Sequence, residues 1–236
     1  MSDERKRGWS FGMWLLLAVV SFLLVAVVLQ RRTYERAHRY DRRETVNNAR
    51  QIGIALFEFE ADFGRFPDET TGPKVRQKTG TELELGNSSS NDYFRQLIAA
   101  GIATSERMFY SDSAYSKKLH LEKDPGDQPL GPGSVGFGYL MNGKSGLSTE
   151  GNPARPIVCA PLAFDGKTVS RQKFDPDPHD GIAVVLRIDN SVTSLPIDKK
   201  TKNLILAPGK SLLETGPNSV WGDTDHPVII PPLPKR

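Results

Sequence analysis

The chain has 236 residues, of which 38% are hydrophobic and 25% charged, so one sizeable core can form after a membrane segment is subtracted. Thirty-one Lys and Arg against 28 Asp and Glu give a formal charge of +3, and much of this excess flanks an apolar segment. We therefore expect no nucleic-acid partner. The single cysteine, Cys159, cannot form an intramolecular disulfide, and its apolar neighbours predict a small buried side chain.

The strongest signal is an uncharged run over residues 9–29, which is long enough to cross the ~30 Å hydrocarbon core as a helix. We predict that residues 1–8 form a short basic N-terminus and that residues 9–30 form a transmembrane helix. A cleaved secretory signal would have a shorter apolar region that ends in small residues, whereas Arg31 and Arg32 directly follow this one. The segment is therefore expected to span the membrane.

The charges beside the span bear on orientation. Three Lys and Arg precede it, and six follow within residues 31–43. Lys and Arg are enriched on the cytoplasmic side of a membrane span, so this count favours a cytoplasmic head. The interleaved acidic residues contribute little to this positive-inside rule.

No proline follows the span until Pro67, so the helix is predicted to continue past the membrane. Residues 31–44 are almost all polar and indicate a neck that lies in solvent or among lipid headgroups. From about Thr45, apolar residues recur at spacings of three and four and predict a stripe that packs on a head. We predict a helical neck and spine over residues 31–64, ended by Gly64 as a C-cap. The stripe consists of Val46, Ala49, Gly53, Leu56, Phe59 and Phe63.

Residues 65–228 are predicted to form a globular α+β head. Thr, Gly, Lys, Asn and Ser dominate residues 70–91, which predicts a loop before a short helix that starts near Asn91. Residues 111–134 are also predicted as loop. Asp189-Asn190 is a candidate two-residue hairpin turn between the last two of four predicted strands. These strands cover residues 135–141, 157–162, 182–188 and 191–197.

Packing a small antiparallel sheet against the amphipathic half of the long helix would bury its stripe. The predicted fold class is therefore α+β, with a long N-terminal transmembrane and amphipathic helix as its spine. Residues 229–236 form a proline-rich tail that either trails from the head or docks on it as extended chain.

Residues 49–68, ARQIGIALFEFEADFGRFPD, resemble the end of the first helix of type II secretion pseudopilins, with its aromatic-Gly-x-aromatic-Pro turn. Segments of the head are similar to pseudopilin-like bacterial proteins. The resemblance implies a pilin-like fold and a structural or assembly role in protein transport, without enzymatic activity. It also implies a bacterial cell membrane, a single pass, a periplasmic head, and other pilin-like subunits or secretion-system proteins as partners.

The N-terminus resembles a pilin leader in part. Lys6-Arg7-Gly8 is similar to a basic leader that ends in glycine, which implies cleavage between Gly8 and Trp9. Family members carry a glutamate at the fifth mature position, where this chain has Met13. An alternative hypothesis is therefore a membrane-tethered extracytoplasmic binding module that does not enter a fibre.

Candidate metal ligands concentrate before the predicted hairpin, where Asp175, Asp177 and Asp180 offer the oxygens that calcium prefers. Some pseudopilins bind calcium near their C-terminal loops, so the resemblance implies a candidate calcium site in this loop. The spacing misses an EF-hand, and a rigid, solvated Pro-Asp loop is the alternative that we favour. Asp223, Asp225 and His226 form a second candidate group. No other cofactor is expected.

Residues 138–145, GYLMNGKS, match the phosphate-binding P-loop pattern, but no helix can follow them because glycines and prolines interrupt the next residues. Residues 139–141 are also strand-like rather than a flexible loop, so we do not expect a nucleotide site here. A third and less favoured hypothesis is a tethered enzyme, which would need a pocket with polar groups around Ser145, His179 or Asp180.

Overall fold

The computed structural model describes residues 3–117, 128–205 and 211–235. The chain divides into an N-terminal unit, Met1–Tyr40, and a head unit, Asp41–Arg236. Helix α1, Asp3–Phe63, contributes residues to both units. Gly64 ends it with φ 85°, and its N–H donates to the carbonyl of Glu60 at 2.7 Å, so a left-handed glycine closes the last turn as expected.

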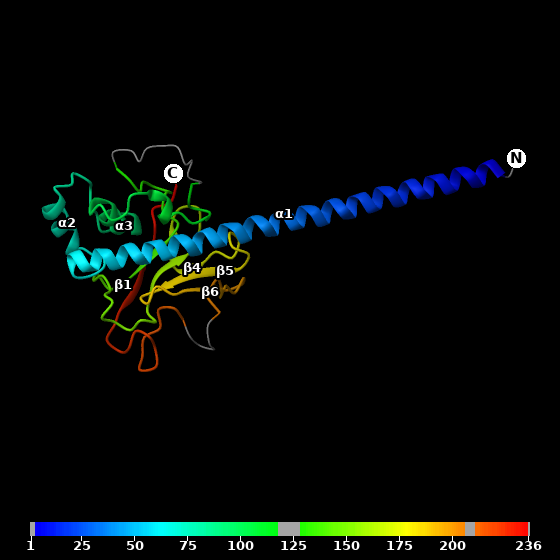
Figure 1. Cartoon of the computed structure of the whole chain (residues 1–236). Helices are drawn as coiled ribbons and strands as arrows, with labels where there is room; N and C mark the ends of the chain where they lie inside the picture. Colours follow the sequence, from blue (N-terminus) through cyan, green and yellow to red (C-terminus); the bar gives the residue numbers. More distant parts are fainter. Residues whose placement is uncertain (1–2, 118–127, 206–210, 236) are drawn as a thin grey trace. The chain divides into compact units, whose positions relative to one another are not determined.

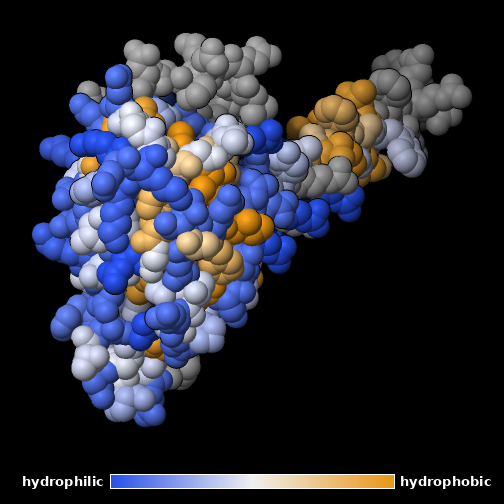
Figure 2. All heavy atoms as spheres, turned by 60° about the vertical axis from the view of Figure 1, so that its left-hand side comes forward, coloured by the Kyte–Doolittle hydropathy of each residue, from blue (hydrophilic) through white to orange (hydrophobic). Residues whose placement is uncertain are grey.

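The N-terminal unit contains an apolar stretch of α1, Gly12–Thr33, with a mean hydropathy of 2.8 and none of its side chains buried. Its 22 residues are enough to cross a bilayer at ~1.5 Å per residue. The hydroxyl of Thr33, at the end of this stretch, donates a hydrogen bond to the carbonyl of Gln30 at 2.8 Å. Figure 2 shows the apolar side chains of this unit in orange. This helix is a candidate single-pass anchor.

The head unit is built on an antiparallel sheet of five strands in the order β6-β5-β2-β1-β7. Figure 1 labels β1, β5 and β6 of this sheet. A second sheet pairs two short strands, β3 and β4. The predicted α+β class with an antiparallel sheet is confirmed. The bounds are β1 Gly138–Asn142, β2 Pro156–Ala160, β3 Leu162–Phe164, β4 Val169–Phe174, β5 Ile182–Arg187, β6 Val192–Pro196 and β7 Pro227–Ile230.

The C-terminal part of α1 supplies one side of the head's core. Ala49, Leu56 and Phe59 are fully buried, and the Phe59 ring stacks on Phe63 with centroids 4.5 Å apart. Val46 is partly buried against the same cluster. The buried face is wider than the narrow stripe that the spacing indicated, because it also includes Thr45, Asn48, Ile52 and Ala55.

One predicted loop needs correction, whereas the other, residues 111–134, contains no helix or strand among its described residues. Residues 70–91 contain a helix, α2, Thr71–Thr79, where the sequence indicated only loop. Pro73 lies in its first turn, where a proline costs no backbone hydrogen bond, and Gly80 closes it with φ 67°. A four-residue 3-10 helix, η1, Glu106–Phe109, precedes the predicted loop of residues 111–134, of which residues 118–127 lie outside the described part of the chain.

Helix α3, Ser90–Ala99, starts one residue before the predicted Asn91. Ser89 and Asp92 form a capping box at its start. The segment predicted as a tail docks here as extended chain. Its first two residues belong to β7, the carbonyl of Pro231 accepts from the N–H of Ser90 at 3.0 Å, and the N–H of Leu233 donates to the side chain of Asn91 at 2.8 Å.

Gly53 allows the β5–β6 hairpin to approach α1 closely. A Cβ atom at this position would lie 2.1 Å from Oδ1 of Asn190 and 3.3 Å from a methyl group of Leu186. Asn190 occupies the predicted hairpin turn with φ 61°, and its Oδ1 is buried without a hydrogen-bond donor among the described residues. Glycine is therefore required at 53 by the approach of the hairpin and not by backbone conformation.

Replacing Gly53 with alanine is expected to lower the free energy of unfolding by about 1–2 kcal/mol. Overpacking costs about 1–3 kcal/mol, whereas the helix propensity of alanine returns only about 0.5–1 kcal/mol. Asn190→Gly removes the clashing atom and suits the positive φ, so the double variant should recover most of the loss. Urea unfolding of the four proteins in this cycle measures the effect. Equal losses from Gly53→Ala with and without the Asn190→Gly substitution would contradict the clash.

Candidate functional site

The predicted calcium ligands lie in the loop between β4 and β5. Asp177 and Asp180 are exposed, Asp175 is half-buried, and Oδ1 of Asp175 accepts from the N–H of Asp177 at 3.1 Å. The N–H of Gly181 donates to the carbonyl of Pro176 at 2.6 Å, so hydrogen bonds within the loop hold its shape. Among the described residues no three His, Cys, Asp or Glu side chains converge as a metal site. Calcium binding here stays a prediction.

His179, in the same loop, turns inward and is 1% exposed. Its Nε2 lies 3.3 Å from the hydroxyl of Thr45 on α1, and that hydroxyl lies 3.0 Å from the hydroxyl of Ser111. Because Thr45 also donates to the carbonyl of Asp41 at 2.9 Å, its oxygen is left to accept from the imidazole or from Ser111. This buried cluster fastens the loop to α1 and offers no access to a substrate.

The P-loop-like segment forms β1 and the tight turn after it. Asn142 and Ser145 exchange backbone hydrogen bonds of 3.0 Å around Gly143, which has φ 58°. The ammonium of Lys144 is mostly exposed and lies 3.4 Å from a carboxylate oxygen of Glu69. No helix begins at this turn, so the segment lacks the helix N-terminus that a P-loop presents to phosphate. The strand-like residues of this segment do form a strand, as predicted.

The residues of the second candidate metal group, Asp223, Asp225 and His226, differ in their surroundings. The carboxylate of Asp225 forms a salt bridge with Arg155 and accepts from the side chain of Asn142 at 2.6 Å. The guanidinium also donates to the carbonyl of Val220 at 3.0 Å, whereas Asp223 and His226 are exposed. Arg155 thus supplies the positive charge beside Asp225 and ties the C-terminal loop to the sheet.

A buried carboxylate that the sequence did not single out connects four segments of the head. Asp68 is 1% exposed and accepts from the N–H groups of Thr70, Thr71 and Gly146 at 2.7, 3.0 and 3.1 Å. The hydroxyl of Thr71 donates to the side chain of Gln96 on α3 at 2.6 Å, and the Gln96 amide donates to the carbonyl of Asp68. The network joins the end of α1 to α2, α3 and the turn after β1.

Hydrogen bonding controls the ionisation of Asp68 and Asp92. Burial alone would raise both pKa values, but donors from Thr70, Gly146 and Thr71 outweigh it and lower the pKa of Asp68. Burial is likewise outweighed at Asp92, where donors from Ser88, Ser89 and Arg95 lower the pKa. Both side chains are therefore carboxylates at neutral pH.

Stability is expected to fall as the pH drops below the usual aspartate pKa of 3.8. A carboxyl whose folded-state pKa is lowered contributes stability above that value and loses it as the pH falls through the folded pKa. Burial raises the pKa of Asp175, so that residue contributes in the opposite direction. Denaturant midpoints between about pH 7 and pH 3 measure the slope. The slope of stability against pH should flatten in Asp68→Asn and in Asp92→Asn, and an unchanged slope in these two variants would contradict the assignment.

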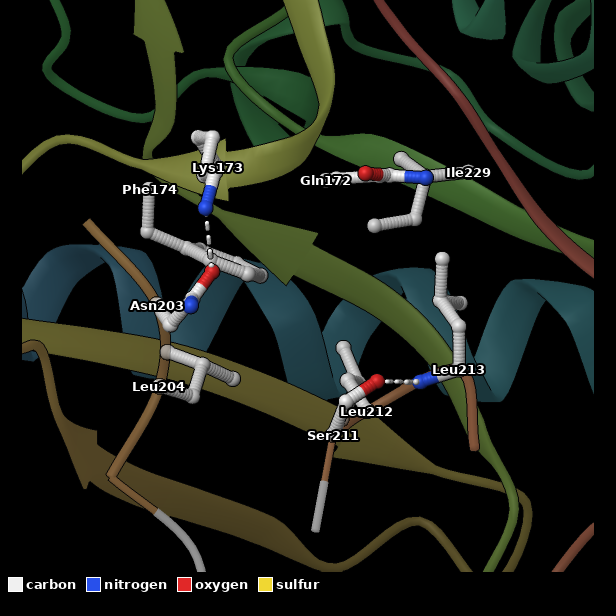
Figure 3. A pocket seen from close by; sticks show the side chains of 9 residues that line it. All are labelled: Gln172, Lys173, Phe174, Asn203, Leu204, Ser211, Leu212, Leu213 and Ile229. Carbon is white, nitrogen blue, oxygen red and sulfur yellow. Dashed lines mark hydrogen bonds between the residues drawn. The ribbon is translucent and has the colours of Figure 1, made fainter. Parts of the chain in front are cut away.

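One pocket with a volume of about 440 Å³ lies between β4, β7 and the segments around residues 203 and 212 (Figure 3). Phe174, Leu204, Leu213 and Ile229 give it apolar walls. The ammonium of Lys173 bonds to Oδ1 of Asn203 at 2.9 Å.

The polar groups of the pocket do not form a catalytic pair. Oγ of Ser211 accepts from the N–H of Leu213 at 3.2 Å, and Figure 3 shows Lys173 and Ser211 at separate ends. Sequence patterns carried no signal for this pocket, because it depends on strand β4, in which residues 171–173 are exposed.

The reactive residue types elsewhere in the described chain are also separated. Cys159 is fully buried in β2, and burial raises the pKa of its thiol well above neutral pH, so the thiol stays protonated. Ser145 lies in the exposed turn after β1, whereas His179 is buried against α1. Residues Gly8 and Trp9, between which cleavage was predicted, lie within α1.

The described residues thus define an α+β head with an antiparallel sheet, preceded by an N-terminal helix that is long and apolar enough to span a membrane. Comparisons with known proteins found no matching family model, no similar curated protein and no similar solved structure. Function is therefore inferred from the residues of the chain itself.

Proposed function

We propose that this chain is a pilin-like, membrane-anchored structural or assembly protein of a type II secretion or pilus-like system. The observation that carries the proposal is the double use of α1. One helix supplies the apolar stretch Gly12–Thr33 and, from Thr45 onward, the buried face of the head's core. A helix with both roles suits a subunit that is held in a membrane by its N-terminus and presents a folded head.

The proposed location is the bacterial cell membrane, with the head on the periplasmic side. The proposed partners are other pilin-like subunits or secretion-system proteins, which would contact the apolar stretch laterally. The large apolar side chains described in this stretch, such as Phe22 at 73% exposure and Leu24 at 63%, are not covered by any other described residues. Lipid or neighbouring apolar helices must therefore cover them. This role needs no catalytic residue and no cofactor.

N-terminal sequencing of the protein purified from membranes of a host with a prepilin peptidase tests the proposal. We expect a mature chain that begins at Trp9. Gly8→Val should block the cleavage, whereas the matched change Gly12→Val should not, because a side chain at Gly12 meets no atom within 4 Å. An intact Met1 in the wild-type protein would exclude the hypothesis that the chain is a processed fibre subunit.

The second candidate function is a tethered extracytoplasmic binding module that never enters a fibre. Met13 favours it, because its side chain is apolar and 61% exposed where the pilin-like pattern has a glutamate. Both functions place the head outside the cytoplasm, and protease added to intact spheroplasts checks this. Digestion of the head is expected, and full protection would overturn both.

A further inference from the structure

Four arginines lie at the end of the apolar stretch and just beyond it within the N-terminal unit: Arg31, Arg32, Arg36 and Arg39, which we call the arginine cluster. Because they lie on α1, at 3.6 residues per turn their positions fall within an arc of about 140° around the helix. Glu35 is the one acidic position within that arc. The cluster is therefore a one-sided basic stripe with a net charge of about +3.

The basic charge of the chain is concentrated beside the apolar stretch. Residues 1–40 carry seven Lys and Arg against three Asp and Glu, which leaves 24 against 25 for residues 41–236. The head is thus almost neutral, and the stripe does not follow from a generally basic protein.

The basic residues that follow the span are also of one type. All six basic residues between positions 31 and 43 are arginines, whereas residues 44–236 contain 13 lysines and nine arginines. A guanidinium group donates two parallel hydrogen bonds to a phosphate, which a lysine ammonium cannot do. The composition therefore points to phosphate groups rather than to negative charge in general.

The position of the cluster decides where such phosphates come from. Arg31 and Arg32 are exposed and lie in the last turn of the stretch Gly12–Thr33, and the other two follow within two turns. When this stretch spans a bilayer, the cluster begins at the level of the lipid headgroups.

We propose that the arginine cluster binds the phosphate groups of anionic phospholipids in the leaflet where the span ends. Attraction to an anionic membrane surface contributes about 1 kcal/mol for each basic side chain, and four arginines outnumber the single Glu35, so one glutamate does not neutralise the stripe. The proposal rests on membrane anchoring and not on fibre membership. Bound anionic lipid would fix the depth of the helix and surround the protein with a selected lipid.

The test uses the full-length protein in phosphatidylcholine vesicles with spin-labelled lipids. The protein-associated fraction of labelled phosphatidylglycerol is compared with that of labelled phosphatidylcholine. We expect at least about a fivefold preference for phosphatidylglycerol, the ratio equivalent to ~1 kcal/mol for one basic contact. Salt of about 0.5 M should reduce it, because screening weakens exposed charges.

Substituted proteins separate the proposal from general electrostatics. Replacing the four arginines with glutamine should abolish the preference, whereas four glutamines at the exposed head positions 167, 171, 199 and 200 should leave it unchanged. Replacing the cluster with lysine should give an intermediate value. A wild-type preference near one, equal losses in both glutamine variants, or a lysine variant equal to wild type would each overturn the assignment to lipid phosphate. So would displacement of the labelled lipid by duplex DNA, which would indicate a nucleic-acid surface.

Discussion

Deleting residues 12–33 is expected to move this protein from the membrane fraction to the soluble fraction with its head still folded. Each Leu, Ile, Phe or Val of a spanning helix favours the bilayer by about 0.3–0.6 kcal/mol, so the stretch as a whole contributes on the order of 5 kcal/mol. The head should survive because every buried apolar residue of the described core lies at Ala49 or beyond. Alkaline carbonate extraction followed by thermal unfolding of the soluble fraction measures both parts.

Two arginine substitutions control this experiment. Leu23→Arg places a charge in the middle of the stretch, at a cost of about 3 kcal/mol, and should weaken membrane retention. Ile205→Arg changes an equally apolar residue that is 52% exposed on the head and should leave retention unchanged. If carbonate releases the full-length wild-type chain, α1 is not a membrane span and the anchor is excluded.

Replacing Asp68 with alanine is expected to cost about 3–4 kcal/mol, the largest loss for a single polar side chain of the head. The change leaves the N–H groups of Thr70, Thr71 and Gly146 without their acceptor, and each buried unsatisfied group costs about 1–3 kcal/mol before water relieves part of the penalty. For a domain of this size the melting temperature should fall by roughly 10 °C. Calorimetry or thermal circular dichroism of the purified protein measures the shift.

Asp62→Ala provides the matched control, because it also removes a carboxylate near the end of α1. Asp62 is half-exposed and pairs with Lys78 at 2.9 Å, so its loss should cost about 0.5 kcal/mol or less. Similar shifts for the two variants would show that the Asp68 network does not hold the head together.

The parts of the fold that the sequence predicted are the helix and strands with a strong apolar pattern. The stripe from Val46 to Phe63 repeats apolar residues at the period of a helix, whereas the strand that became β5 is a short continuous apolar run whose central residues are all buried. Helix α2 was missed because its nine residues include Gly72 and Pro73 and only Val75 is a buried large apolar side chain. The signal that could have found it is Pro73 in the first turn together with Gly80 after the last.

The polar sites could not be predicted from the sequence for a different reason. Asp68 gains its partners from α3 and from the turn after β1, which lie 28 and 78 residues away along the chain. The pocket beside Lys173 likewise depends on β4 and β7, neither of which alternates strictly between apolar and polar residues. Spacing along a sequence reports local periodicity, whereas these sites depend on how distant segments meet.

Strand β7 is the last strand to be synthesised, yet it pairs with β1, the first. A nascent or clipped chain that lacks residues 227–230 therefore leaves the backbone of β1 as an unprotected sheet edge, the kind of edge that invites aggregation or proteolysis. Pairing with β7 therefore protects this edge only when residues 227–230 are present and in register with β1.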